Sequence, residues 1–417
     1  MNQTYLQIIL CFGTWLLSAC FHQAVAQTEE ARNADSKRDF TISDRALEIH
    51  HRGYVWDGHN DLPWALREAG DRSFSKIDIR NPQAKLHTDI PRLRRGNVGA
   101  QFWSVFVPAK ERFQGTAFQS TIEQIAIVKA MMEKYPDIFE FATSAEDVIR
   151  IRKSGKIASL IGVEGGHSIE NSISLLRQLH AAGAKYMTLT HGDSLDWADA
   201  ATDKPINDGL SEFGEEVVRE LNRLGMLVDL SHVSPATMLD AIRVSTAPII
   251  FSHSSSRAIA DHPRNVPDDI LNDVRANGGV VMVNFFSGFI EPRSAMNVQG
   301  MFDVRRELEA KHGTDTEAIT RDLARWRDDH PIYPGDASIV VEHIDHIAKV
   351  VGIEHIGIGS DFDGVTVLPI GLEDVSTYPL ITELLLRKGY SEQDIHKIMH
   401  GNILRVVARC DEVAARK

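Results

Sequence analysis

The stretch 54–64 reads Tyr-Val-Trp-Asp-Gly-His-Asn-Asp-Leu-Pro-Trp. Its first half is a short apolar run that predicts a β-strand, and Pro63 ends the pairing because it has no N–H to donate. Side chains two residues apart in a strand point the same way, so His59 and Asp61 leave the strand end together. An imidazole and a carboxylate placed in this way can bind a divalent metal, although an ordinary surface turn would also account for the two residues taken alone.

Seven further apolar runs have the same character. Together they predict eight strands, at 54–61, 99–107, 157–164, 186–191, 226–232, 248–253, 279–285 and 355–361. Amphipathic stretches with apolar residues three and four apart lie between most of them, for example at 121–134, 172–182, 213–224, 235–244 and 267–276. Strands that alternate with helices pair in parallel through right-handed crossovers. We therefore predict an α/β fold, a (β/α)8 TIM-like barrel, with an open doubly wound sheet as the alternative.

One segment breaks the alternation of strands and helices. Residues 291–335 are longer than a barrel loop requires, and they contain helical patterns at 301–311 and 316–328. We interpret this segment as a helical insertion after strand 7, on the face where the strands end. It would act either as a lid or as a packing or dimer element. Helices at 375–387 and 392–400 would close a single barrel that covers 46–412.

The N-terminal residues predict a targeting segment at 1–20, followed by a polar tether at 21–45. The apolar run 6–17 is too short to span a bilayer comfortably, and the following Leu-Ser-Ala-Cys at 17–20 resembles a bacterial lipoprotein signal. Ala24-Val25-Ala26 is a rival site typical of ordinary secretion. We expect an exported protein, either periplasmic or anchored in the outer membrane through a lipid on Cys20. Cys11 lies inside the targeting segment, and a lipidated Cys20 has no free thiol. Cys410 would then have no cysteine to pair with, so we expect no intrachain disulfide.

The composition indicates which classes of partner the protein would bind. The formal net charge is −13, and no basic stripe offsets it, which argues against a nucleic-acid partner. The chain has 18 histidines, more than its length requires, and this raises the expectation of metal chemistry.

Polar residues follow most of the predicted strands at the same point, the carboxyl end. His59 and Asp61 end the first strand, Glu164 the third, His191 the fourth, His232 the fifth, His253 the sixth and Asp361 the eighth. In a barrel these ends converge on one rim, where such folds place their sites. A ligand-capable group at a buried strand end is costly unless it is paired or binds a metal. The joint pattern predicts a hydrolytic metal site of the metal-dependent hydrolase type.

The kinds of ligand at the strand ends indicate which metal ion the site would bind. Imidazoles and carboxylates without a thiolate suit zinc, although manganese or cobalt could also be held. Five ligands, His59, Asp61, Glu164, His232 and His253, are too many for one catalytic zinc with an open position. We therefore expect two Zn²⁺ ions bridged by Glu164, which lies between the other ligands in barrel order. Such a pair can hold a bridging hydroxide as nucleophile and polarise a carbonyl oxygen.

The ordered motifs resemble those of the membrane (renal-type) dipeptidases, and the likeness covers about 47–407. The motifs are Asp-Gly-His-Asn-Asp at 57–61, Gly-Val-Glu-Gly at 162–165, Leu-Thr-His at 189–191, Asp-Leu-Ser-His at 229–232, Phe-Ser-His-Ser at 251–254, Arg-Asn-Val-Pro-Asp-Asp at 264–269 and Gly-Ser-Asp-Phe-Asp-Gly at 359–364. The resemblance implies a two-zinc barrel that hydrolyses dipeptides, accepts a D-residue at the second position and forms a homodimer.

The resemblance also implies a role for each residue. His59, Asp61 and Glu164 would hold one zinc, and Glu164, His232 and His253 the other. The catalytic residues would be His191, which steadies the oxyanion, and Asp361, which binds the substrate amino group or carries the proton to the leaving amine. Arg264 would pair with the substrate carboxylate, a task suited to a guanidinium fork.

The chain departs from some relatives at one substrate position. Phe289 stands where those relatives carry a Tyr near the substrate carboxylate, so the substrate contact there is expected to differ. Two other functions remain as alternatives. One is a different amide or ester hydrolase on the same barrel, which would commonly bridge its metals with a modified lysine where this chain has Glu164. The other is a lipid-anchored binding protein with a degenerate site.

Overall fold

The computed structural model describes residues 40–313 and 315–416. The predicted targeting segment 1–20, the predicted lipidation at Cys20 and most of the tether 21–45 lie outside these residues. Export, lipid anchoring and the homodimer therefore stay predictions. Among the described helices, none combines the length and the apolar character that a bilayer crossing requires.

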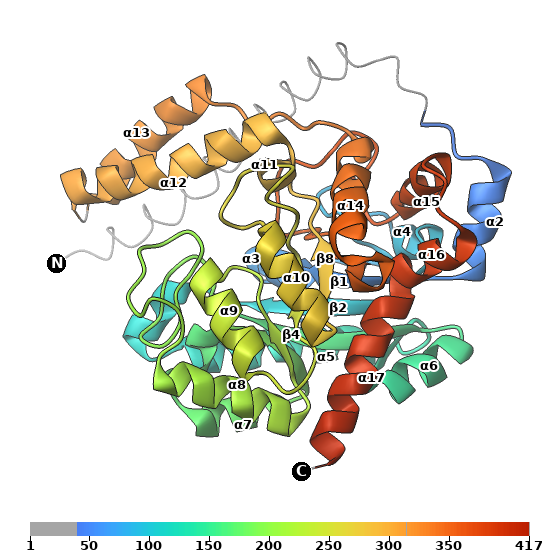
Figure 1. Ribbon diagram of the computed structural model, residues 1–417, viewed down its shortest axis with the longest axis horizontal. Helices are drawn as coiled ribbons and strands as arrows, with labels where there is room; N and C mark the ends of the chain where they lie inside the picture. Colours follow the sequence, from blue (N-terminus) through green and yellow to red (C-terminus); the bar gives the residue numbers. More distant parts are fainter. Residues whose placement is uncertain (1–39, 314, 417) are drawn as a thin grey trace.

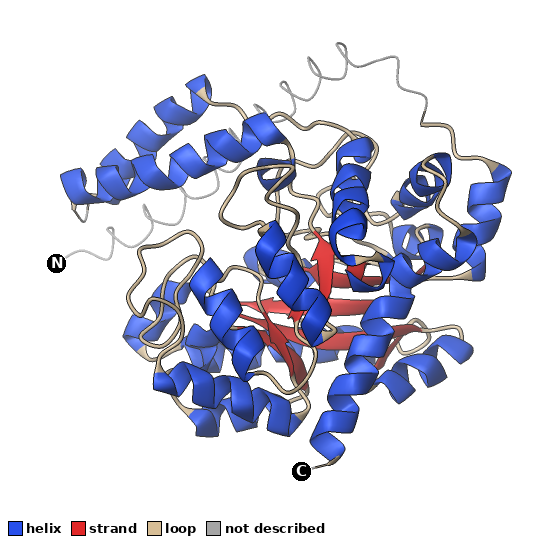
Figure 2. Cartoon of the chain, viewed as in Figure 1, coloured by secondary structure: helices blue, strands red, loops and turns tan. Residues whose placement is uncertain are grey.

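The predicted barrel is confirmed. Eight parallel strands close on themselves, because the neighbour order runs β2-β1-β9-β8-β7-β6-β5-β4 and β4 pairs back with β2. The barrel strands are β1 (Val55–Asn60), β2 (Val98–Phe106), β4 (Ile157–Glu164), β5 (Ala184–Thr188), β6 (Leu227–Asp229), β7 (Ile250–Phe251), β8 (Val280–Val283) and β9 (Ile356–Ile358). Closure excludes the open doubly wound sheet, and the helices surround the strands (Figure 2).

A ninth strand was not predicted. β3 (Phe139–Phe141) pairs in parallel with the first residues of β4, while β5 pairs with β4 only from Ile161 onward. β3 therefore pairs with the first residues of β4, and β5 pairs with the later residues on the same side of β4. Its three residues are too few to produce a periodic pattern in the sequence.

The helices follow the strands in chain order (Figure 1). They are α2 (Asp44–Arg52), α3 (Leu62–Glu68), α4 (Ile90–Arg95), α5 (Ala117–Lys134), α6 (Ala145–Lys153), α7 (Ile173–Ala181), α8 (Glu212–Leu224), α9 (Pro235–Val244), α10 (Asp268–Asn277), α11 (Ser287–Ile290), α12 (Pro292–His312), α13 (Thr316–Asp329), α14 (Ala337–Val351), α15 (Tyr378–Arg387), α16 (Glu392–His396) and α17 (Asn402–Ala415). Short turns of other helical type are η1 (Ala109–Gln114), η2 (Gly166–Ile169), η3 (Ile353–His355) and η4 (Lys397–Gly401).

Helix α9 shows why some boundaries are readable from sequence. Its N-cap is Ser234, whose hydroxyl accepts from the backbone N–H of Thr237, and Pro235 takes the first helical position. This pairing of a Ser cap with a following Pro needs no long-range contact. The observed bounds of α9 match the predicted ones.

The predicted ends of several strands were wrong. The ladders stop at Thr188, Asp229 and Phe251, two or three residues before the histidines that the predicted strands included. His232 has φ +70° and Asp361 has φ +68°, which no strand residue adopts. The apolar runs continue into the rim loops, because residues there are buried without being paired, so hydrophobicity alone placed the strand ends too late.

The insertion after the seventh barrel strand is confirmed as helical. α12 begins at Pro292, nine residues before the predicted pattern, because the Glu291 side chain accepts from the Ser294 N–H and caps the helix. α12 and α13 pack side by side and project beyond the rim of the barrel (Figure 1). At the other end of the chain, α17 was missed, since a π-helical turn at Lys397–Gly401 joins it to α16.

Two buried histidines join elements of the barrel in their neutral form. His343 in α14 accepts from the Ser256 N–H through Nδ1 (3.0 Å) and faces the Ile290 carbonyl through Nε2 (3.0 Å). His50 in α2 contacts Thr382 Oγ1 (2.8 Å) and the Gly96 carbonyl (3.0 Å). Burial lowers the pKa of both imidazoles to about 4.

We expect the stability of the protein to fall in mild acid. The folded pKa of His343 and of His50 lies below the ordinary value of 6.5, so the unfolded chain takes up the proton first. Their contribution is complete above pH 6.5 and is lost as the pH falls toward 4. Each should cost roughly 2 kcal/mol between pH 7 and pH 5.

The measurement is urea unfolding at pH 7, 6 and 5 on chelator-treated protein, so that metal release does not enter the comparison. His343→Gln preserves a donor and an acceptor without titrating, so its stability should depend less on pH by roughly 2 kcal/mol. An unchanged pH dependence in this variant would contradict the assignment.

Candidate metal centre and substrate pocket

The polar residues predicted at the strand ends gather at one rim of the barrel. Seven of the nine predicted site residues line a single cavity of about 340 Å³: Asp61, Glu164, His191, His232, Arg264, Phe289 and Asp361. The other two, His59 and His253, lie behind this surface, with 0% and 1% of their side chains exposed. Their rings are stacked at a tilt, with centroids 3.9 Å apart.

Glu164, the last residue of β4, lies at the centre of the cluster. Its Oε2 faces His59 Nε2 at 3.5 Å and accepts a hydrogen bond from Ser104 Oγ at 3.0 Å. Its Oε1 faces His232 Nε2 at 3.1 Å and His253 Nε2 at 3.6 Å. Burial alone would raise the pKa of Glu164, but the imidazole of His59 helps hold it well below its usual range. The carboxylate is therefore ionised, and each oxygen faces a different set of nitrogens.

His59 is oriented by a tyrosine that the sequence did not indicate. Its Nδ1 lies 2.9 Å from Tyr186 Oη, and that hydroxyl donates to the Gly58 carbonyl at 3.4 Å. Nδ1–H therefore donates to Tyr186, and Nε2 is the nitrogen that faces the carboxylates. Burial lowers the pKa of His59, but Tyr186, Glu164 and Asp61 together hold it well above its ordinary value. Nε2 is buried without a hydrogen bond, 3.2 Å from Asp61 Oδ2. Gly162 makes this possible, because a Cβ there would lie 2.0 Å from the Tyr186 ring.

His253 is oriented by a second relay of hydrogen bonds. Ser252 Oγ donates to Asp229 Oδ2 at 2.6 Å, so its lone pair is free to accept from His253 Nδ1–H at 2.8 Å. Asp229 also accepts from Thr188 Oγ1 at 2.6 Å. The lone pair of His253 is thereby placed on Nε2, which lies 2.8 Å from His232 Nε2. Burial lowers the pKa of His232 and His253 well below the usual range, so both are neutral, the form that binds metal.

The donor set fits metal ions. Among the described residues, there are three groups of donors whose ligand atoms lie within 4.8 Å of one another: His59 with Glu164 and His253, Glu164 with His191 and His232, and His59 with Asp61 and Asp361. Glu164 belongs to two of these groups, as a shared carboxylate would. Two residues that sequence reasoning assigned to substrate, His191 and Asp361, also lie within reach of a metal.

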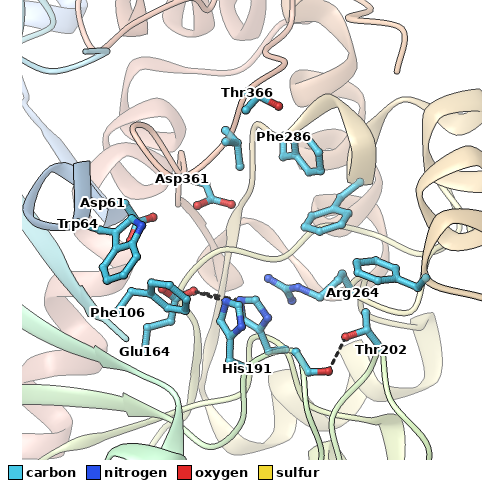
Figure 3. A pocket seen from close by; sticks show the side chains of 16 residues that line it. Asp61, Trp64, Phe106, Glu164, His191, Thr202, Arg264, Phe286, Asp361 and Thr366 are labelled. Carbon is cyan, nitrogen blue, oxygen red and sulfur yellow. Dashed lines mark hydrogen bonds and ion pairs between the residues drawn. The ribbon is translucent and has the colours of Figure 1, made fainter. Parts of the chain in front are cut away.

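Arg264 and Asp361 bring a guanidinium and a carboxyl group into the cavity from different sides, with Arg264 on the right and Asp361 above (Figure 3). Arg264 is 2% exposed, and its fork donates only to Ser254 Oγ (3.3 Å) and the His253 carbonyl (3.2 Å). Within the described chain its Nε has no partner. Burial lowers its pKa to about 10, so the guanidinium stays charged. A buried cation that meets only neutral acceptors is costly, unless a ligand supplies the anion.

Asp361 accepts a hydrogen bond from Asn284 Nδ2 at 2.8 Å, and its backbone N–H donates to the His59 carbonyl at 3.1 Å. Burial raises the pKa of its carboxyl to about 7. Gly364 allows the two carboxylates to approach, since a Cβ there would lie 2.1 Å from Asp61 Oδ2 and 2.8 Å from Asp361 Oδ1. Asp361 can therefore hold or release a proton near neutral pH.

Comparison with known proteins shows to which family this chain belongs. A family model described as membrane dipeptidase (peptidase family M19) matches residues 43–417. The chain belongs to the membrane dipeptidase family. The predicted resemblance is confirmed, and the protein is a metallodipeptidase.

Solved structures agree with this assignment. The probable dipeptidase PvdM from Pseudomonas aeruginosa is 25% identical, with a TM-score of 0.77, and the match covers 89% of this chain and 98% of that one. A metallopeptidase from Rhodobacter sphaeroides, solved with a phosphinate mimic of the dipeptide L-Ala-D-Ala, is 23% identical, with a TM-score of 0.68, and the match covers 86% of this chain and 99% of that one.

In this dipeptidase, His191 lies at the junction of metal centre and cavity. Its Nε2 is 3.5 Å from Glu164 Oε1, and its ring stacks on that of His232 with centroids 4.3 Å apart. The side chain is 29% exposed, more than those of His232 and His253. Burial lowers its pKa, so a neutral His191 can donate a hydrogen bond into the cavity.

Sequence reasoning missed several residues that shape the site. Tyr186, Asp229 and Ser252 orient ligands, but they lie within the predicted strands, at positions that hydrophobic periodicity assigns to the barrel core. A polar residue on a strand buried on both faces is the signal that could have found Asp229 and Ser252. Phe302 lines the cavity from α12, and no local pattern connects it with the strand ends.

Proposed function

We propose that this metallodipeptidase is a dinuclear zinc enzyme that hydrolyses the peptide bond of dipeptides and accepts a D-residue at the C-terminal position. His59, Asp61 and Glu164 would hold one ion, and Glu164, His232 and His253 the other. Bound zinc would supply a bridging hydroxide nucleophile at neutral pH and a Lewis acid for the carbonyl oxygen. The observation that carries the dipeptide assignment is the pair of opposite charges at the two sides of one small cavity.

The residues around the cavity would have separate roles in substrate binding and catalysis. Arg264 binds the C-terminal carboxylate of the substrate, which provides the anion that its buried guanidinium lacks. Asp361 binds the amino group or carries a proton to the leaving amine, and Asn284 keeps its carboxyl in place. His191 donates to the oxygen that becomes negative during attack. Because Arg264 and Asp361 line one cavity of about 340 Å³, both ends of a short peptide could be bound there at once.

Tolerance of a D-residue rests on the resemblance and on one relative. The Rhodobacter sphaeroides metallopeptidase was solved with a mimic of a dipeptide whose second residue is D-alanine. This chain has the same fold, and we extend the preference to it as part of the proposal.

The test compares a free dipeptide with its C-amidated and N-acetylated forms on zinc-loaded protein. Each cap removes one charged contact, so kcat/KM should fall about 10- to 100-fold for either cap. The L,L and L,D forms of the free dipeptide, measured in the same panel, test whether the enzyme accepts a D-residue at the C-terminal position. Equal rates on the free and capped forms would contradict recognition of both ends.

A further inference from the structure

The wall of the cavity around Arg264 is aromatic. The guanidinium carbon of Arg264 lies 5.2 Å from the centre of the Phe289 ring. The His262 ring lies 4.7 Å from Phe289 and 6.1 Å from Phe302, so it stands behind both phenyl rings. His262 is fully buried, whereas Phe289 and Phe302 are half-buried and line the cavity. We call Phe289 and Phe302, backed by His262, the aromatic cup.

The aromatic cup is built from two separate parts of the fold. Phe289 belongs to α11, and the Asn265 side chain donates to its carbonyl at 2.7 Å, which ties it to the loop that carries Arg264. Phe302 belongs to α12 of the insertion. One turn further on, Arg306 donates to the Thr202 carbonyl at 2.9 Å, and Thr202 itself lines the cavity near Arg264 (Figure 3). The insertion is thus attached to the cavity wall at the position of Phe302.

The position of the aromatic cup decides which part of a substrate it meets. This step rests on the proposed function, in which Arg264 binds the C-terminal carboxylate. The side chain of the C-terminal residue branches from the carbon that carries this carboxylate, so it must lie beside the guanidinium. The surfaces there are the exposed faces of Phe289 and Phe302. The N-terminal residue lies at the opposite side, next to Asp361.

The chemistry of the cup favours a large apolar group. A phenyl or branched aliphatic side chain would cover both ring faces and remove them from water. A methyl group would leave most of that surface exposed. A carboxylate side chain would lose hydration beside rings whose negative faces offer it no partner. Differences of a single methylene in an apolar pocket already change specificity by about 10- to 200-fold.

We propose that the preferred dipeptides carry a large apolar C-terminal side chain, aromatic or branched aliphatic, and that Phe302 of the insertion is a specificity-determining residue. The insertion then forms part of the substrate site. Phe302 acts by packing against the substrate side chain and takes no part in the reaction at the peptide bond.

The test measures kcat and KM of the full-length, zinc-loaded protein on alanyl dipeptides whose second residue is alanine, leucine, phenylalanine or aspartate, each in L and D form. The wild type should prefer leucine or phenylalanine over alanine at least about tenfold in kcat/KM. Phe302→Ala should reduce this preference about tenfold, mainly through a higher KM for the dipeptides that end in leucine or phenylalanine. Phe302→Leu should retain most of the preference.

Met296→Ala is the matched control. Met296 is a large apolar residue on the same helix, 63% exposed and outside the cavity lining, so its removal should leave the preference unchanged. Equal rates on alanine, leucine and phenylalanine, a preference for aspartate, or an unchanged preference in Phe302→Ala would overturn the inference. Failure to hydrolyse any dipeptide would overturn the proposed function and this inference with it. Hydrolysis of alanyl-alanine without selectivity would overturn only the inference.

Discussion

Glu164→Gln should lower kcat/KM on a simple dipeptide by about 10³-fold or more and reduce the metal content of the purified protein. The carboxylate presents one oxygen to His59 and the other to His232 and His253. An amide has a single acceptor oxygen, and its NH₂ group would direct hydrogens at one of the two positions. Even residues that only support a metal ligand are worth 10- to 100-fold, so loss of a shared ligand should cost more.

The measurement pairs metal analysis with steady-state kinetics. Wild type should retain two zinc ions per chain after dialysis, and the variant one or none. Glu216→Gln is the control, since Glu216 is an exposed carboxylate on α8 that neither lines the cavity nor belongs to one of the three donor groups. Full zinc content together with full activity in Glu164→Gln would refute the shared-ligand model. One zinc ion per chain in the wild type would refute the dinuclear one.

Arg264→Met should lower kcat/KM on a free dipeptide by about 10²- to 10³-fold, mostly through a higher KM. The guanidinium is buried, and within the described residues it donates hydrogen bonds only to Ser254 and the His253 carbonyl, so its strongest interaction is reserved for a ligand anion. A C-amidated dipeptide should be affected much less, and the ratio of free to amidated rates should approach one. This cycle of enzyme and substrate changes isolates the contact between Arg264 and the carboxylate.

The folded state should tolerate this change. Methionine removes a buried charge whose partners are neutral, so the melting temperature of Arg264→Met should not fall. Arg257→Met is the control, because Arg257 lies in the same loop and donates to the carbonyls of Asn265 and Pro263 without lining the cavity. It should leave the ratio of free to amidated rates as in the wild type. A similar loss on free and amidated substrates in Arg264→Met would mean that Arg264 serves the loop and not the substrate.

The barrel was predictable because its evidence is local in the chain. A strand buried on both faces is a short apolar run, and an amphipathic helix repeats every three to four residues, so both can be read without knowing their neighbours. The residues at the end of each strand can also be identified from the sequence without knowing their neighbours in space. His59, Glu164 and His253 could therefore be assigned to one rim as soon as the strands were taken as parallel.

The features that could not be predicted from the sequence depend on strand pairing or on contacts across the fold. β3 has three residues, and its identity as a strand comes only from its pairing with β4. The strand ends before His232 and Asp361 depend on left-handed backbone angles that no propensity indicates. α17 lies beyond a π-helical turn that obscures the period of the preceding helix. In each case the deciding interaction joins residues that are distant or irregular in the chain.

The sequence by itself determined the type of barrel, the rim on which the site lies and the kinds of ligand available there, because periodicity and strand-end residues are local properties. Only the tertiary structure decided how those ligands are held. The register that sets Glu164 beside Thr188, and Thr188 beside Asp229, brings Tyr186 to His59 and Asp229 to Ser252. The same is true of Phe302, whose place beside the pocket follows from the packing of the insertion against the rim. Side-chain hydrogen bonds and ring contacts act over a few ångströms, and only the folded chain brings their partners within that distance.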